Sequence, residues 1–423
     1  MAVIEELSEL PVPGRQGRPG RSQQVRGRLV VLSAVAILSV LAVYLPLTLL
    51  APLAPTSAQL VPFIIPDRVA TLPMLPGYGA SAVGAIGYPE AFATAGSTEP
   101  VPIASISKIV TSLVVLEVKP LWPGDSGPTI TFSATDAALR AKYVALNGET
   151  KPLTAGTTIS QLDLMRVTLV ASANNYADAL TGWAFGSRAA FEFAVTAWLS
   201  SHGLDHTTIV EPTGINPGNV SSATDLVAIG KLALANPVVA SIVSTATMTL
   251  AGVGSFANTN TLLGRLGVEG IKTGTLNGSS NLLFAATFRY GSHAVTVVGA
   301  VVGAIDHKAV DATVTTLLAG MKAGFHEVTL TKKGEPFANF RTAWSQKARA
   351  VSSRAASLLV WSNTPVTAVI SALPARVSEA RAPIGRVTFT AGSQSVIVLL
   401  TLDHRLIDPG PWWRLSNPTQ LSG

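Results

Sequence analysis

The chain has 423 residues, of which 48% are hydrophobic and 13% are charged, so it is long enough for two folded domains with substantial cores. It contains no cysteine, which excludes disulfide bonds, cysteine nucleophiles and cysteine-based metal sites. The formal net charge is +6, but the basic residues are scattered and no aromatic stacking motif accompanies them, which argues against a nucleic-acid-binding surface.

The N-terminal region predicts a tail followed by a membrane span. Residues 1–28 are rich in Gly, Pro, Arg and Glu, a composition typical of disorder. Residues 29–54 carry no charged side chain and are long enough to cross a hydrocarbon core of about 30 Å. Because arginines precede this segment, the positive-inside rule predicts a cytoplasmic N-terminus and an extracytoplasmic remainder. These arginines are Arg15, Arg18, Arg21, Arg26 and Arg28.

We therefore expect a single-pass protein of the cell membrane. The alternative is a secretory signal cleaved at residues 55–58, which would give a secreted protein. The apolar core of such a signal usually covers only about 7 to 15 residues, so the span is favoured. In either case the rest of the chain is exported, and its positive charge suits a place near anionic envelope polymers.

A linker is predicted at 55–76, where prolines are frequent, and a first domain at 77–325. This domain starts with small-residue strands near 80–88 and 91–95, followed by a helix that begins close to Ser105. Apolar spacing and polar caps predict further helices that start at Ser160 or cover 187–202 and 223–234.

The pattern changes to strands after residue 272. Segments 282–290 and 293–304 flank Gly291-Ser292, a two-residue hairpin signal. A second, smaller β-rich domain is expected at 326–423, with strands at 358–361, 366–373, 384–390 and 396–402. The order of elements predicts an α+β first domain in which a long helical insertion separates the strands.

Three short motifs occur in order along the first domain: Ser105-Ile106-Ser107-Lys108, Ser172-Ala173-Asn174 and Lys272-Thr273-Gly274. Each alone could arise by chance, but together they are the signature set of serine acyl-transfer enzymes that bind penicillin. A competing Ser279-Ser280-Asn281 follows the third motif, so the order favours Ser172. We expect a serine hydroxyl to attack an amide carbonyl with the help of a lysine.

The first motif predicts a nucleophile and its base. Residues three apart share a helix face, so Ser105 and Lys108 can approach within hydrogen-bond reach. A lysine that acts as a base must be neutral, and free lysine titrates near about 10.4, so burial and a nearby positive charge must lower its pKa. Lys272 could supply that charge. The helix N-terminus would also provide half of an oxyanion hole.

The third motif predicts a binding site for a terminal carboxylate. Lys272, Thr273, Gly274 and Thr275 precede a strand region, where alternate side chains face one side. Gly274 permits close approach of a substrate backbone, and a lysine with hydroxyl groups suits a carboxylate.

Other titratable residues suggest structural roles. His202 and His206 are four apart, but Gly203 lies between them and no third ligand is near, so no metal site and no cofactor are expected. Asp178 and Asp225 fall within helical patterns and are expected to cap helices or join polar networks.

With these motifs the chain resembles the low-molecular-mass penicillin-binding proteins of the D-alanyl-D-alanine carboxypeptidase family. The resemblance covers roughly residues 78–418. It implies the transpeptidase fold shared with β-lactamases, an antiparallel sheet flanked by helices with a helical insertion, and a small C-terminal β-rich domain. Further matching segments are Pro212-Thr213-Gly214, 221–226, 258–263, Gly270-Ile271 and 408–413.

The resemblance also implies roles for the motif residues. Ser105 would be acylated, Lys108 would accept its proton, Ser172 would pass a proton to the leaving D-alanine, and Asn174 would orient the substrate amide. Lys272, Thr273 and Thr275 would bind the carboxylate, and the N–H groups of Ser105 and Thr275 would form the oxyanion hole. The implied substrate is a peptidoglycan stem peptide ending in D-Ala-D-Ala, and β-lactams would be covalent inhibitors.

Two features depart from the family pattern. Many members have an acidic residue where Asn175 stands, and familiar members carry a C-terminal amphipathic anchor helix, whereas this chain ends in Thr419–Gly423 without one. The N-terminal span is expected to replace that anchor.

Two other classes remain open. A class A β-lactamase shares the motifs but adds a glutamate that activates the deacylating water, and Glu211 to Asn216 superficially resembles that loop, one residue too long. A wall-binding scaffold without catalysis is the other alternative, which the intact motif residues argue against.

Overall fold

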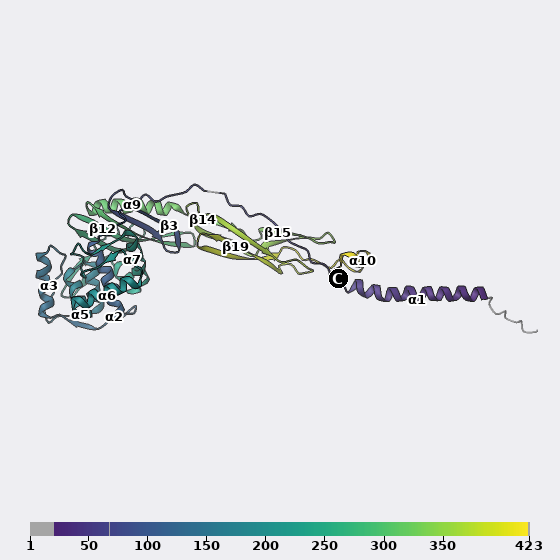
Figure 1. The fold of residues 1–423 in the computed structure, drawn as a ribbon, viewed down its shortest axis with the longest axis horizontal. Helices are drawn as coiled ribbons and strands as arrows, with labels where there is room; N and C mark the ends of the chain where they lie inside the picture. Colours follow the sequence, from purple (N-terminus) through teal and green to yellow (C-terminus); the bar gives the residue numbers. More distant parts are fainter. Residues whose placement is uncertain (1–20, 67, 422–423) are drawn as a thin grey trace, which may run out of the picture.

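The computed structural model describes residues 21–66 and 68–421. The molecule is elongated: a long helix projects from one end, a small β domain lies in the middle and a mixed domain at the other end (Figure 1). This helix is α1 (Arg21–Leu49), and its portion Val25–Leu49 is long and apolar enough to cross a membrane. A signal sequence near the N-terminus can have the same length and composition.

The structure describes only part of the predicted N-terminal tail. Residues 1–20 lie outside the described part of the chain, whereas residues 21–28 are helical, so the prediction of disorder is wrong for them. Arginine and glutamine are good helix formers and extend the apolar helix by two turns. The helix ends at Leu49, five residues before the predicted end of the span.

The mixed domain is built on a five-stranded antiparallel sheet of order β11-β12-β13-β2-β3. Tyr290 pairs with His293 across the turn between β12 and β13, which confirms the predicted hairpin. The strands are β2 (Ala80–Ala85), β3 (Tyr88–Gly96), β11 (Val268–Leu276), β12 (Ser279–Tyr290) and β13 (His293–Ala304). The sheet unites two segments that are far apart in the chain, with the predicted helical insertion between them.

Helices cover both faces of this sheet. One face packs on the insertion, which forms the larger apolar core, and the other packs on α9 (His307–Gly324). The predicted cap Ser160 accepts a backbone N–H three residues on, and Ser187 and Ser222 cap their helices in the same way. Within the insertion lie η1 (Ala104–Ile106), α2 (Ser107–Val118), α3 (Ala134–Ala145), α4 (Gln161–Val170), α5 (Asn174–Phe185), α6 (Arg188–Ser201), α7 (Ala223–Ala235) and α8 (Pro237–Val243). The predicted fold class is confirmed.

Short strand pairs complete the mixed domain. They are β4 (Val101–Pro102), β5 (Thr129–Thr131), β6 (Thr158–Ser160), β7 (Thr207–Thr208), β8 (Val220–Ser221), β9 (Thr247–Leu250) and β10 (Gly254–Ala257). Among them, β4 and β8 pair beside η1, and so fix the chain just before Ser105.

The small domain contains the four predicted strands and three that were not predicted. Its six-stranded sheet has the order β1-β15-β16-β20-β19-β18, and β14 pairs with β17. The predicted strands are β17 (Ala356–Trp361), β18 (Val366–Ala372), β19 (Pro383–Ala391) and β20 (Gln394–Leu402), and the additional ones are β14 (Phe325–Thr331), β15 (Pro336–Arg341) and β16 (Lys347–Ser352). Alanine is a weak strand former, and it occupies buried positions of β15 and β16, which explains the missed prediction. The chain then forms α10 (Pro411–Ser416) and η2 (Pro418–Gln420).

The linker predicted at 55–76 is partly built into the small domain. Strand β1 (Gln59–Leu60) pairs with β15, and Thr56 forms a bridge with Ala375. Phe63 packs edge-on against Phe389 at 5.0 Å between ring centroids. These contacts hold the segment along the domain rather than leaving it free.

Candidate active site

The three motifs meet in one open groove of about 600 Å³ at the edge of the five-stranded sheet. Ser105 lies in the turn of 3₁₀ helix before α2, Ser172 follows α4, and Asn174 begins α5. The third motif lies on the edge strand β11. Of the predicted site residues, Ser105, Ser172, Asn174, Thr273, Gly274 and Thr275 line the groove, and Lys108 and Lys272 are buried.

Lys108 is placed to act on Ser105. Its Nζ lies 2.8 Å from Ser105 Oγ and 2.6 Å from both Asn174 Oδ1 and the Thr213 carbonyl oxygen. Burial lowers the pKa of Lys108 well below its usual range, and the charge of Lys272 lowers it further. A neutral amine has two N–H groups and one lone pair. Because the two carbonyl oxygens take the N–H groups, the lone pair is available to the Ser105 hydroxyl.

Lys272 lies on the other side of the groove. Its Nζ donates to Ser172 Oγ at 2.9 Å and to the Thr273 carbonyl oxygen at 3.2 Å. Burial lowers the pKa of Lys272 to about 7, against an opposing effect of Glu149 at the rim. Ser172 therefore connects a lysine that can hold a positive charge with the space where a substrate would lie.

Two glycines allow the backbone to close around Ser105. A Cβ on Gly274 would lie 2.6 Å from the Ile103 carbonyl oxygen, and one on Gly214 would lie 1.9 Å from the Ala104 carbonyl oxygen. Gly214 also has φ +83°, in the left-handed region that favours glycine. Ser172 itself adopts φ +56°, an uncommon conformation that the packing must maintain.

A buried carboxylate supports this backbone from behind. Glu211 accepts the N–H groups of Thr213 at 2.8 Å and Gly214 at 2.5 Å. Asn219 donates to Glu211 and to Ser107 Oγ, and so links this loop to the first motif. Glu211 does not line the groove, and its two oxygens are engaged by the loop. This geometry gives Glu211 a structural role and not that of a lactamase base.

His307 is a groove residue that the sequence analysis missed. It is the first residue of α9, and its Nε2 lies 2.7 Å from Thr275 Oγ1. Neither spacing nor a motif connects these two residues, since they meet only because α9 packs against the sheet. Glu149 was also missed, because it comes from the loop after α3.

The remaining titratable residues have the expected structural roles. Asp178 pairs with Lys142 and Arg188. Asp225 accepts the N–H of His206 and the hydroxyl of Thr207. His202 caps the end of α6, where its ring packs on Trp198.

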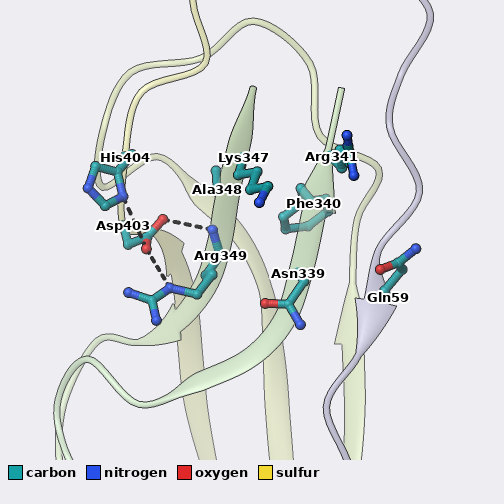
Figure 2. Close-up of a pocket in the computed structure, with 9 residues that line it drawn as sticks. All are labelled: Gln59, Asn339, Phe340, Arg341, Lys347, Ala348, Arg349, Asp403 and His404. Carbon is teal, nitrogen blue, oxygen red and sulfur yellow. Dashed lines mark hydrogen bonds and ion pairs between the residues drawn. The ribbon is translucent and has the colours of Figure 1, made fainter. Parts of the chain in front are cut away.

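A second cavity lies in the small domain, where Arg341, Lys347 and Arg349 come together with Asp403 (Figure 2). Asp403 pairs with Arg349 at 2.8 Å. The cavity is polar and basic but carries no serine beside a buried lysine. The acyl-transfer chemistry therefore belongs to the groove at the sheet edge.

The fold and the groove define a penicillin-binding serine acyl-transfer domain. Residues 92–302 match the model of the D-alanyl-D-alanine carboxypeptidase family. The domain that carries the groove belongs to this family, and the resemblance inferred from the motifs is confirmed.

Individual proteins support this assignment. The D-alanyl-D-alanine endopeptidase of Escherichia coli is 34% identical over 200 residues, which cover 44% of this chain and 59% of that protein. The alignment thus spans about three fifths of the length of this relative. Penicillin binding protein 5 from Haemophilus influenzae has the same fold, with a TM-score of 0.55 at 19% identity, over 82% of this chain and 100% of that one. The Streptomyces K15 DD-transpeptidase matches at 25% identity with a TM-score of 0.52, over 59% of this chain and 98% of that one.

Proposed function

We propose that this protein is a serine-type D-Ala-D-Ala carboxypeptidase that removes the terminal D-alanine from peptidoglycan stem peptides. The observation that carries the proposal is the contact between Lys108 and Ser105 at a groove whose Ser172 is bonded to Lys272. This arrangement supplies a nucleophile, a base and a cationic binding site, which is what cleavage next to a terminal carboxylate requires.

Acylation begins with transfer of the Ser105 hydroxyl proton to neutral Lys108. Oγ attacks the carbonyl carbon of the penultimate D-alanine, and the carbonyl oxygen becomes negative. The N–H groups of Ser105 and Thr275 stabilise this oxyanion from the two sides of the groove. The C–N bond then breaks, the proton held by Lys108 passes through the Ser172 hydroxyl to the leaving amine, and free D-alanine departs while Lys108 returns to its neutral form.

Lys272 holds the substrate carboxylate during this step. Thr273 and Thr275 add hydroxyl donors along the same strand, and Asn174 orients the substrate amide. His307 fixes the Thr275 hydroxyl and lies at the carboxylate end of the site. Water then attacks the acyl-enzyme ester, which releases the shortened peptide and restores the Ser105 hydroxyl.

A second candidate function is endopeptidase cleavage of cross-linked stem peptides. It is favoured by the name of the Escherichia coli relative, which is a D-alanyl-D-alanine endopeptidase. The acyl-enzyme is the same in both reactions, and only the leaving group differs. A stem peptide ending in D-Ala-D-Ala and a cross-linked dimer, offered to the purified protein in parallel, distinguish the two by release of D-alanine or of monomers.

We further propose that α1 anchors the protein in the cell membrane, with its N-terminus in the cytoplasm and the catalytic groove outside. The apolar length of α1 and the arginines before it support this topology. Secretion after cleavage is the alternative. A mature N-terminus near residue 59 in secreted material would overturn the anchor.

Ser105→Ala tests the nucleophile. We expect the wild-type protein to form a long-lived covalent adduct with a fluorescent penicillin and to release D-alanine, and the variant to do neither. Matched Ser112→Ala changes a buried serine on the same helix outside the groove and should retain labelling. Labelling of Ser105→Ala would refute the assignment. Rapid hydrolysis of penicillin by the wild-type protein would instead indicate a lactamase. If the wild-type protein neither reacted with penicillin nor released D-alanine, the result would indicate a scaffold without catalysis.

A further inference from the structure

The end of the small domain next to α1 gathers three tryptophans. Trp344 lies in the turn between β15 and β16 and contacts Trp413 of α10, with 5.7 Å between ring centroids. Trp412, beside it on α10, is 83% exposed. We call this cluster, Trp344, Trp412 and Trp413, the tryptophan end.

The tryptophan end is joined directly to α1. The Tyr44 hydroxyl donates to the Leu415 carbonyl oxygen at 2.7 Å, and Arg414 donates to the Ala51 carbonyl oxygen at 2.5 Å. Arg414 is also paired with Asp408, so its position is fixed from both sides. Figure 1 shows α10 beside the end of α1 that faces the small domain.

These contacts determine the depth of α10 relative to a bilayer. A hydrocarbon core of about 30 Å takes roughly 20 helical residues, so a span that starts at Leu29 reaches its outer boundary near Thr48. Tyr44 is four residues, or about 6 Å, inside that boundary. The long Tyr44 side chain can carry its hydroxyl outward to this boundary, where it is bonded to Leu415 of α10. This bond places α10 at the inner edge of the headgroup layer, where tryptophan and tyrosine are enriched in membrane proteins.

The surroundings of the tryptophan end match this environment in charge. Arg341 and Lys347 flank the Trp344 turn and line the cavity in Figure 2. Arg405, which precedes α10 in the chain, is also exposed. Basic side chains at this level are attracted to anionic phospholipid headgroups. An exposed tryptophan surrounded by arginine and lysine suits the polar–apolar boundary of a bilayer.

We propose that the tryptophan end is a lipid-interface surface that rests in the headgroup layer of the outer leaflet. It would give the small domain a second contact with the membrane besides α1 itself. The inference rests on the membrane anchor proposed above, and it is independent of the reaction assigned to Ser105.

Because the chain has no cysteine, single labels can test this inference in the full-length protein. Trp412→Cys places a nitroxide at the tryptophan end. Ser395→Cys is the matched control, since it is an exposed residue of the same domain beside Gln394, which contacts Gly87 of the catalytic domain. Both variants are reconstituted into vesicles of phosphatidylcholine and phosphatidylglycerol, and their accessibility to oxygen and to a water-soluble nickel chelate is measured.

We expect a several-fold higher ratio of oxygen to nickel accessibility at position 412 than at position 395. Because the label replaces the indole, a second measurement uses native tryptophan. Brominated lipids should quench a larger fraction of the emission in wild type than in Trp412→Phe.

Equal accessibility at the two positions, with no difference in quenching, would overturn the inference. Protection of position 412 only after addition of an anionic wall polymer would also overturn it and assign the surface to that polymer. Loss of the N-terminal segment, seen in the intact mass, would refute the anchor and this inference together. Penicillin labelling of Ser105 would remain, so failure of the proposed reaction is detected separately.

Discussion

Two lysines lie buried at the base of the groove, and their proposed roles require opposite protonation states. Lys108 must be neutral to accept the Ser105 proton, whereas Lys272 must be charged to hold a carboxylate. Burial lowers the pKa of both, that of Lys272 to about 7, and only the pKa of Lys108 is lowered further by a neighbouring lysine charge. The charge on Lys272 helps to keep Lys108 neutral, so the binding residue also prepares the base.

This arrangement predicts a bell-shaped pH dependence of acylation. The rate should fall as pH decreases through the depressed pKa of Lys108, because the base becomes protonated. It should also fall as pH rises above about 7, because Lys272 loses its charge. The measurement is the second-order rate constant for a fluorescent penicillin from about pH 5 to about pH 10.

Lys272→Arg provides the control, because arginine stays charged throughout this range. We expect a lower maximum rate without the decline on the alkaline side. A variant that keeps the wild-type alkaline decline would show that another group causes it.

The loop that carries Gly214 and the strand that carries Gly274 enclose the turn of Ser105. Glycine at these positions lets separate elements approach to backbone contact, and Glu211 holds the loop through its N–H groups. The geometry of the nucleophile therefore depends on neighbouring elements as much as on the helix that follows it.

Gly214→Ala should disturb this packing. The added Cβ would lie 1.9 Å from the Ala104 carbonyl oxygen, so the backbone at Ser105 must move. We expect penicillin acylation to slow by about 100-fold, since a displacement of about 1 Å can have that effect. Stopped-flow or gel-based labelling measures the change.

Gly186→Ala is the matched control. Gly186 has a similar φ of +74°, at the end of α5, but among the described residues no atom beyond its own helix and chain neighbours lies within 4 Å of an added Cβ. The substitution should lower the free energy of unfolding by about 1 kcal/mol, because alanine is disfavoured in the left-handed conformation. The rate of acylation should be unchanged. Equal acylation rates in the two variants would contradict the role assigned to Gly214.

The whole molecule is arranged in a line, with the catalytic domain at the far end of the small domain from α1 (Figure 1). The segment between α1 and the first domain runs along the small domain and contributes β1 to its sheet. The small domain therefore lies between α1 and the catalytic domain, and the segment that joins these two parts packs along it.

Phe63→Ala tests whether this segment stabilises the small domain. Removing the ring contact with Phe389 should lower the stability of the docked segment by about 1–3 kcal/mol, because Phe63 is only half-buried. Hydrogen exchange of residues 55–66 should increase, while penicillin acylation stays unchanged. Ile64→Ala, at an adjacent residue that is 83% exposed, should have an effect below about 0.5 kcal/mol. Similar exchange in both variants would show that the segment is not held by Phe63.

Features that depend on local spacing could be predicted from the sequence alone. It predicted the order of the motifs, the helix caps such as Ser160, and the hairpin at Gly291-Ser292, since each involves residues that are close in the chain. The main errors of prediction lie where composition is ambiguous, as in the helical residues 21–28 and in strands β15 and β16, whose buried positions include alanine.

Contacts between residues far apart in the chain could not be predicted in this way and are seen only in the folded molecule. In the folded molecule His307 lies beside Thr275, the carboxylate oxygens of Glu211 accept N–H groups of its own loop, and α10 contacts α1. None of these contacts follows from a repeat or a spacing. They arise because the burial of apolar faces brings α9 to the sheet and the C-terminal segment to α1, and the polar groups then pair with whatever partners that packing provides.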